Sequence, residues 1–149
     1  MSSVVEVRPG PRVRVAPSAL ALVESARHGL ASAQDEPTPA ARYVGAHLAA
    51  LRAAAAVVAA RAEPPGSRRR RLQSVWELLP KVEPTLCEWA AFFAASAAKR
   101  AAAEAGLPRA VSAREADDLL RDAGTFVTLA EGALGIPAGQ ELLPLPTAG

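Results

Sequence analysis

The chain has 149 residues, of which half are hydrophobic but only 4% are aromatic, and its formal net charge is +2. This length and the abundance of alanine predict one helical domain with a core of its own, because alanine lets helix backbones approach each other closely. The net charge lies within residues 1–16, which excludes a surface that is basic all over, and the single cysteine, Cys87, excludes an intramolecular disulfide.

Residues 1–16 are predicted to form a flexible N-terminal tail. Valine alternates there with arginine or glutamate as in an edge strand, but three prolines interrupt the pattern: Pro9, Pro11 and Pro17. The segment lacks the apolar run of a signal peptide. No stretch of the chain reaches roughly 18 uninterrupted apolar residues, the length of a membrane span. We therefore expect a cytoplasmic protein without a membrane partner.

Two helices are predicted next, over residues 18–33 and from Pro39 to about Ala62. Thr38 before Pro39 is a strong start signal, because a capping hydroxyl precedes a proline at the first helical position. One side of the second helix carries a predicted core stripe: Val44, Leu48, Leu51, Ala55 and Val58. The opposite side is a smooth alanine face around Arg42: Ala46, Ala49, Ala53, Ala56 and Ala60. Such a helix usually has neighbours on more than one side.

Two capping boxes mark helix starts in the second half of the chain: Ser74-Val75-Trp76-Glu77 and Ser112-Ala113-Arg114-Glu115. The first opens a short helix that Pro80 and Pro84 limit, and the second opens the last helix, which Gly135 and Pro137 close. Between them, a long helix begins in the turn of Pro84 and ends at Gly106.

These elements together predict an all-α fold. We expect an antiparallel up-and-down four-helix bundle with a short extra helix before the third long helix, because the connections are short enough for antiparallel neighbours. The predicted organisation is a flexible N-terminal tail over residues 1–16, a helical bundle over residues 17–135 and a flexible C-terminal tail over residues 136–149.

Arg42 and His47 are the candidate catalytic residues. Arginine offers a permanent positive charge with forked donors that suit phosphate, and histidine can transfer a proton near neutral pH. Such a pair could support metal-independent cleavage of RNA. Five residues place the two side chains about 140° apart on one helix, so they converge best when a second copy faces them in a symmetric dimer. The alanine face around Arg42 would allow that approach.

The alternative is that neither residue forms a site. A histidine on the shoulder of an apolar face more often packs than catalyses, and Arg42 can extend into solvent. The domain would then be a non-catalytic module for protein interaction or dimerisation.

Four segments resemble a family of small actinobacterial HEPN-domain proteins: residues 42–56 (RYVGAHLAALRAAAA), 76–80 (WELLP), 88–94 (EWAAFFA) and 117–123 (DDLLRDA). The resemblance covers most of residues 18–135. It implies a helical, often dimeric protein in a superfamily that includes RNases with an Arg-x(4–6)-His motif and members that bind RNA or nucleotides without cutting. Arg42 and His47 match that spacing, so the resemblance implies phosphate contact for the first and proton transfer for the second.

A second set of candidates is a run of four arginines in a predicted loop. Each arginine that neutralises a phosphate would add salt-dependent affinity for nucleic acid, although such a run is more often a solvated linker. The run consists of Arg68, Arg69, Arg70 and Arg71. The positive end of the last helix explains three aspartates near it better than a metal site does: Asp117, Asp118 and Asp122. We therefore expect no metal and no cofactor.

Two functions follow from the sequence. The first is an HEPN-like bundle that acts on or binds RNA, as a homodimer with Arg42 and His47 near a shared groove. The second is a non-catalytic helical module in which the same two residues serve packing and recognition of a protein partner. Whether the protein is an enzyme stays open at this point.

Overall fold

The computed structural model describes residues 15–61 and 74–137. Five α-helices and one short 3-10 helix follow each other along these residues: α1 (Pro17–Gln34), α2 (Pro39–Arg61), α4 (Val75–Val82), η1 (Pro84–Leu86), α5 (Cys87–Glu104) and α6 (Ala113–Ala133). No strand occurs within the described ranges, and the predicted all-α class is confirmed.

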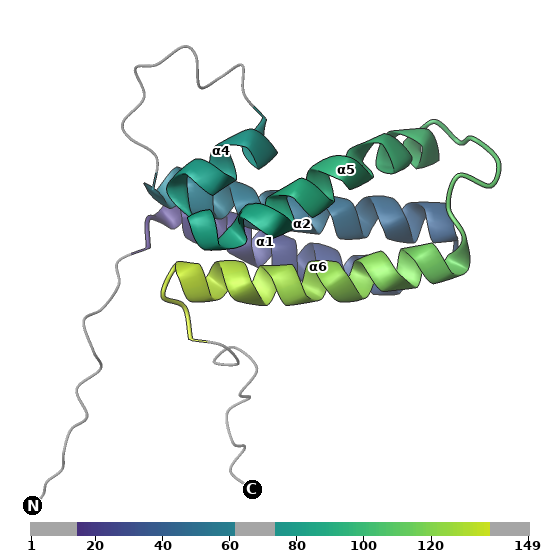
Figure 1. Ribbon diagram of the computed structural model, residues 1–149. Helices are drawn as coiled ribbons and strands as arrows, with labels where there is room; N and C mark the ends of the chain where they lie inside the picture. The colour runs from purple at the N-terminus through teal and green to yellow at the C-terminus, as the bar shows by residue number, and fades with distance from the viewer. Residues whose placement is uncertain (1–14, 62–73, 138–149) are drawn as a thin grey trace, which may run out of the picture.

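The four long helices run in alternating directions along the bundle, and the short α4 lies at the end where α2 finishes (Figure 1). α2 is the central helix, since it packs against α1, α6, α5 and α4. α5 packs on α2 and α4, and its backbone stays farther from α6. The predicted four-helix bundle with a short extra helix before the third long helix is confirmed.

The predicted capping residues begin the helices that follow them. The Ser74 hydroxyl accepts a hydrogen bond from the Glu77 backbone N–H at 3.2 Å, and the Glu77 carboxylate accepts one from the Ser74 N–H at 3.0 Å. Ser112 and Glu115 repeat this exchange at 3.0 and 2.9 Å. The Thr38 hydroxyl accepts a backbone hydrogen bond in the first turn of α2 at 3.1 Å. Local sequence therefore determines where these three helices start.

The alanine face of α2 is buried within the chain, whereas the sequence suggested that it could meet a second copy. Its fully buried members are Ala46, Ala49, Ala53 and Ala56. α1 covers this face so closely that a Cβ placed on Gly45 would lie 2.9 Å from the Cβ of Ala33. The larger side chains of the predicted core stripe, such as Val44 and Leu48, are only half-buried. Small residues, rather than large ones, thus line the contact of α2 with α1.

Aromatic rings fill the space among α2, α4, α5 and α6. This aromatic cluster consists of Trp76, Trp89, Phe92, Phe93 and Phe126. The fully buried Phe93 ring lies at its centre, with its centroid 5.3 Å from that of Trp76 and 5.2 Å from that of Phe126. Phe92 is the exception to this burial, since it is 40% exposed. The cluster therefore reaches the surface beside α5.

Arg61 ties together three helices at one end of the bundle. Its guanidinium donates hydrogen bonds to the carbonyl oxygens of Val82 at 3.1 Å and Ala133 at 2.6 Å, and it also pairs with the Glu83 carboxylate. Val82 and Ala133 are the last residues of α4 and α6, where a positive charge is favoured by the helix dipole. This contact fixes the end of α2 against both helices.

Among the described helices, α2 is the one that is long and apolar enough to cross a membrane by length and composition. The central helix of a globular bundle meets the same criteria. Half of the most apolar part of α2 is buried, and four other helices surround it. Its composition is thus explained by its place in the core.

Several predicted features lie outside the described residues. They are the tail residues 1–14 and 138–149 and the run from Arg68 to Arg71. At the edges of the predicted bundle, Val15 and Ile136 pack partly against the core. The Ile136 N–H also donates to the Glu131 carbonyl oxygen at 2.9 Å. The packed region therefore includes at least one residue on each side of residues 17–135.

Candidate functional site

Arg42 lies in the first turns of α2 and reaches toward α6. Its guanidinium donates to the Asp117 carboxylate at 3.0 Å and to the Glu36 carbonyl oxygen at 3.1 Å. Asp117 is well exposed, so the ion pair contributes little to stability. Its effect is positional, because it links the turn between α1 and α2 to the start of α6. Arg42 is therefore engaged by groups of its own chain.

His47 is buried beside the aromatic cluster, with 1% of its surface exposed. Its Nε2 lies 2.9 Å from the Phe93 carbonyl oxygen. Because a carbonyl can only accept, Nε2 carries the hydrogen and Nδ1 is the bare nitrogen of the neutral ring. Nδ1 is buried and has no hydrogen-bond partner in the described part of the chain. The Trp76 and Phe93 ring centroids stand 6.1 and 5.9 Å from the imidazole centroid, in edge-on orientations.

Burial lowers the pKa of His47 below its usual value of 6.5, because a charged ring is less stable away from water. The hydrogen bond to Phe93 acts in the opposite direction. The positive charge of Arg100 lowers the pKa further, and the negative charge of Glu104 raises it. Since burial is the largest of these effects, the imidazole is neutral at neutral pH.

The structure does not bring Arg42 and His47 together within the chain. Arg42 pairs with Asp117, whereas His47 bonds to Phe93 in the interior. The arginine whose charge acts on His47 is Arg100, which the sequence analysis did not single out. A signal for it existed, because Arg100 follows Phe93 by seven residues and so lies on the same face of α5. The catalytic assignment of Arg42 and His47 stays a prediction.

The other candidate residues from the sequence fall into two groups. The run from Arg68 to Arg71 lies outside the described residues, so its contact with nucleic acid also stays a prediction. The aspartates near the start of α6 lie within ion-pair distance of arginines: Asp117 of Arg42, Asp118 of Arg114 and Arg121, and Asp122 of Arg121.

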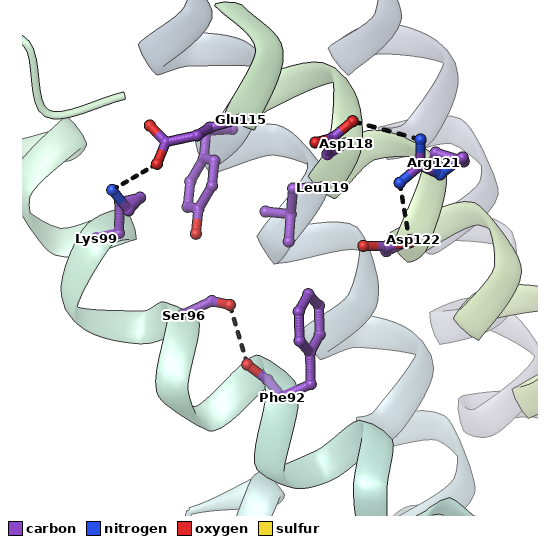
Figure 2. Close-up of a pocket in the computed structure, with 9 residues that line it drawn as sticks. Phe92, Ser96, Lys99, Glu115, Asp118, Leu119, Arg121 and Asp122 are labelled. Atoms are coloured by element: carbon purple, nitrogen blue, oxygen red, sulfur yellow. Dashed lines mark hydrogen bonds and ion pairs between the residues drawn. The ribbon is translucent and has the colours of Figure 1, made fainter. Parts of the chain in front are cut away.

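A hollow of about 280 Å³ lies between α5 and α6, and sequence reasoning missed it (Figure 2). Its floor is apolar and aromatic, whereas its rim is charged. It is lined by Tyr43 of α2, by Phe92, Ser96 and Lys99 of α5, and by Glu115, Asp118, Leu119, Arg121 and Asp122 of α6. Acidic residues in the first turns of a helix are explained by the helix dipole, so they gave no reason to look for a site. The lining residues are far apart in sequence and meet only in the fold.

The two ends of the hollow differ in how firmly their charges are held. At one end, the Lys99 ammonium lies 3.0 Å from the Glu115 carboxylate. The pKa of the Glu115 carboxyl is lowered, first by the hydrogen bond that it accepts from the Ser112 backbone N–H and second by Lys99. At the other end, Arg121 lies 3.3 Å from Asp118 and 3.7 Å from an oxygen of Asp122 (Figure 2). The contacts of Arg121 are thus longer and looser.

Comparison with known proteins gives one match. The family model of an HEPN-like domain matches residues 33–131, about two thirds of the chain. The matched range begins at the end of α1 and includes α2, α4, α5 and most of α6, and so both the Arg42–His47 segment and the hollow. No curated protein and no solved structure matches the chain.

Proposed function

This chain belongs to the HEPN-like domain family whose model spans residues 33–131, and we propose that it is a non-catalytic member, a helical module that binds a partner. The observation that carries the proposal is the burial of His47 with its Nε2 bonded to the Phe93 carbonyl. The competing function is metal-independent cleavage of RNA by Arg42 and His47.

Catalysis by His47 would need contact with a substrate. A general acid or base has to come within hydrogen-bond distance of the proton that it transfers. In this fold Nε2 is occupied by the Phe93 carbonyl and Nδ1 lies below the surface. Exposing either atom means separating α2 from α5 and opening the packed rings around His47. The geometry therefore supports a packing role for His47.

A second copy of the chain does not remove this difficulty. The alanine face that could have brought two Arg42 side chains toward two His47 side chains is covered by α1. An arginine from another protomer could reach only surface atoms, and His47 offers almost none. The homodimer implied by the family resemblance would then join its protomers through another surface.

The charge of the described helices gives no support of its own to binding of an RNA backbone. The described residues carry ten lysines and arginines against twelve aspartates and glutamates, a net charge of −2. Affinity for RNA depends strongly on cations that neutralise phosphates. The described helices therefore offer no excess of cations for a phosphate backbone, and the four arginines of residues 68–71, where the cations of the chain are densest, lie outside them.

The proposal is tested by incubating the full chain, Arg42→Ala and His47→Gln with single-stranded and hairpin RNAs in EDTA and separating the products by length. Glutamine is chosen because its amide can still donate to the Phe93 carbonyl but cannot transfer a proton. We expect no cleavage by any of the three proteins. His47→Ala should lower the melting temperature, because it removes the hydrogen bond and leaves a cavity.

Two results bear on the proposal in opposite directions. Cleavage by the wild-type chain that both Arg42→Ala and His47→Gln abolish, with unchanged circular dichroism, would overturn it. Cleavage that persists equally in both variants would come from another source and would leave the two residues non-catalytic. A gel shift with the same RNAs measures whether the module binds RNA without cutting it.

A further inference from the structure

We propose that the hollow between α5 and α6 binds an alkylguanidinium group, with its charged end at Asp118 and Asp122 and its apolar stem against Phe92 and Leu119. The inference goes beyond the proposed function, because the hollow contains neither Arg42 nor His47. It stands or falls independently of whether the protein cuts RNA.

The first observation is a polar group in the hollow that has no partner. Tyr43 is 5% exposed and lines the hollow. Its hydroxyl makes no hydrogen bond to any described residue. The oxygen itself is not fully buried, so a ligand in the hollow can reach it. A buried phenol normally satisfies its hydroxyl. The free oxygen of Tyr43 can accept a hydrogen bond from a ligand N–H.

The second observation is an excess of acceptors around the same space. Three carboxylates and two basic groups line the hollow. The Ser96 hydroxyl donates to the Phe92 carbonyl at 2.9 Å, which leaves its own oxygen able to accept. A ligand that enters therefore meets acceptors from Ser96, Tyr43, Asp118 and Asp122. A guanidinium, with five N–H donors and no acceptor, is the complementary group.

The third observation concerns the groups that now occupy the carboxylates, which are Arg121 and, at 3.8 Å from Asp118 only, the exposed Arg114. Arg121 spans Asp118 and Asp122 at 3.3 and 3.7 Å, and its side chain is 68% exposed. Exposed ion pairs at such distances contribute little, so a ligand can displace Arg121 at small cost. The pairing also shows that one guanidinium can lie within ion-pair distance of both aspartates. Lys99, in contrast, is held by Glu115 at 3.0 Å and is less easily displaced by a ligand.

An exposed aromatic ring completes the site. Phe92 and Asp122 reach toward the same space from α5 and α6 (Figure 2). Phe92 is 40% exposed, although it belongs to the aromatic cluster. A guanidinium is weakly hydrated and stacks on aromatic faces, which an ammonium does less well. This combination of ring and carboxylate favours a guanidinium over a metal ion or an anion.

The size of the hollow limits the ligand to a small group. A volume of about 280 Å³ lies just below the roughly 300 Å³ at which pockets for drug-sized ligands begin. One arginine side chain from a protein, or a free alkylguanidine, is therefore the appropriate scale. Both sources share the same chemistry, and the experiment separates them.

The test uses the full chain labelled with ¹⁵N and titrated in separate arms with n-propylguanidinium, with a peptide of residues 67–71 (SRRRR), and with butyrate as an anion of similar size. Amide shifts give the affinity and the location of binding. We expect shifts at Phe92, Ser96 and Asp122 with the guanidinium probes and none with butyrate. Raised salt should weaken the binding, because the recognition is partly ionic.

Three variants assign the binding to named groups. Asp122→Asn keeps the shape but removes a charge, and we expect about tenfold weaker binding. Tyr43→Phe removes only the hydroxyl, and about threefold weaker binding should follow. Asp117→Asn is the matched control, since it removes a carboxylate from the same helix outside the hollow, and its affinity should equal that of the wild type.

Each outcome decides the matter. Binding of propylguanidinium with this pattern of variants and equal or weaker binding of the peptide supports a site for free alkylguanidines. Binding of the peptide alone, or tighter binding of the peptide with the same pattern, supports the site and identifies its source as an arginine of a protein chain. No binding of either probe at millimolar concentration, equal binding of butyrate, or equal losses in Asp122→Asn and Asp117→Asn would overturn the inference. RNA cleavage by the wild type that both Arg42→Ala and His47→Gln abolish would overturn the proposed function and leave this site untouched.

Discussion

The contact of α1 with α2 and the contact of α5 with α6 are built in opposite ways. Small residues bring α1 and α2 together, so that a Cβ on Gly45 would lie 2.9 Å from that of Ala33. Large side chains stand between α5 and α6, where the Phe93 and Phe126 ring centroids are 5.2 Å apart. The first contact is too close for a further methyl group at Gly45, whereas the second leaves a hollow of about 280 Å³ at its edge.

This difference teaches where an alanine-rich bundle can place a binding site. Where alanine and glycine line both helices, the backbones approach and every side chain is used in packing. Where aromatic residues act as spacers, the ends of long polar side chains meet around a gap. The motif that drew attention in the sequence begins on α2, but its histidine points into the packed interior. Binding is therefore expected on the open side, at α5 and α6.

The largest expected effect comes from removing an aromatic ring that lies between α5 and α6. Phe93→Ala deletes a fully buried ring at the centre of the aromatic cluster, and we expect the free energy of unfolding to fall by about 3–5 kcal/mol. Phe92→Ala is the matched control at the next position; it should lose only roughly 1 kcal/mol, because that ring is already partly exposed. Urea denaturation measures both. Equal losses would mean that Phe93 does not hold α5 in place.

A smaller effect is expected from crowding the contact of α1 with α2. Gly45→Ala places a methyl group against Ala33, so α1 must shift and the free energy of unfolding should fall by about 1–3 kcal/mol. Gly124→Ala, in the middle of α6, meets nothing within 4 Å. It should raise stability by roughly 0.5–1 kcal/mol, because alanine is the better helix former. Changes of the same sign in both variants would contradict the close contact between α1 and α2.

The fold could be predicted from the sequence because its determinants are local. Ser74 and Ser112 cap the helices that follow them, and each bonds to a residue three positions later. Gly106 and Gly135 follow the ends of α5 and α6 with φ angles of +76° and +80°, which only glycine adopts readily. None of these signals depends on which helices become neighbours.

The candidate site could not be predicted in the same way, because it depends on distant contacts. Helical spacing placed His47 on the shoulder of the apolar face of its helix, but not under α5. Its burial comes from Phe93, 46 residues away, and from Trp76 on α4. Tyr43 likewise lines the hollow only because α5 and α6 lie beside the start of α2. Periodicity shows that a face is apolar, but which neighbour covers it follows from the packing of the whole chain.

The smallest expected effect is a pH dependence of the melting temperature that arises from His47. The pKa of His47 is below 6.5 in the folded chain. At a pH between that lowered pKa and 6.5, the unfolded chain therefore binds the proton more strongly than the folded chain does. The stability it contributes is present above pH 6.5 and is lost as the pH falls, so the melting temperature should decline from pH 7.5 to pH 5.5. The lowered pKa values of Glu83 and Glu115 affect stability only near and below 4.5, outside this range.

His47→Gln should flatten this decline, because glutamine can keep the hydrogen bond to Phe93 but binds no proton in this range. His28→Gln is the matched control, since His28 is exposed on α1, and its profile should follow that of the wild type. If His47→Gln keeps the wild-type slope, the imidazole is not sealed between α2 and α5. The argument that His47 is a packing residue and not a catalyst would then lose its physical basis, since an imidazole open to water is also open to a substrate.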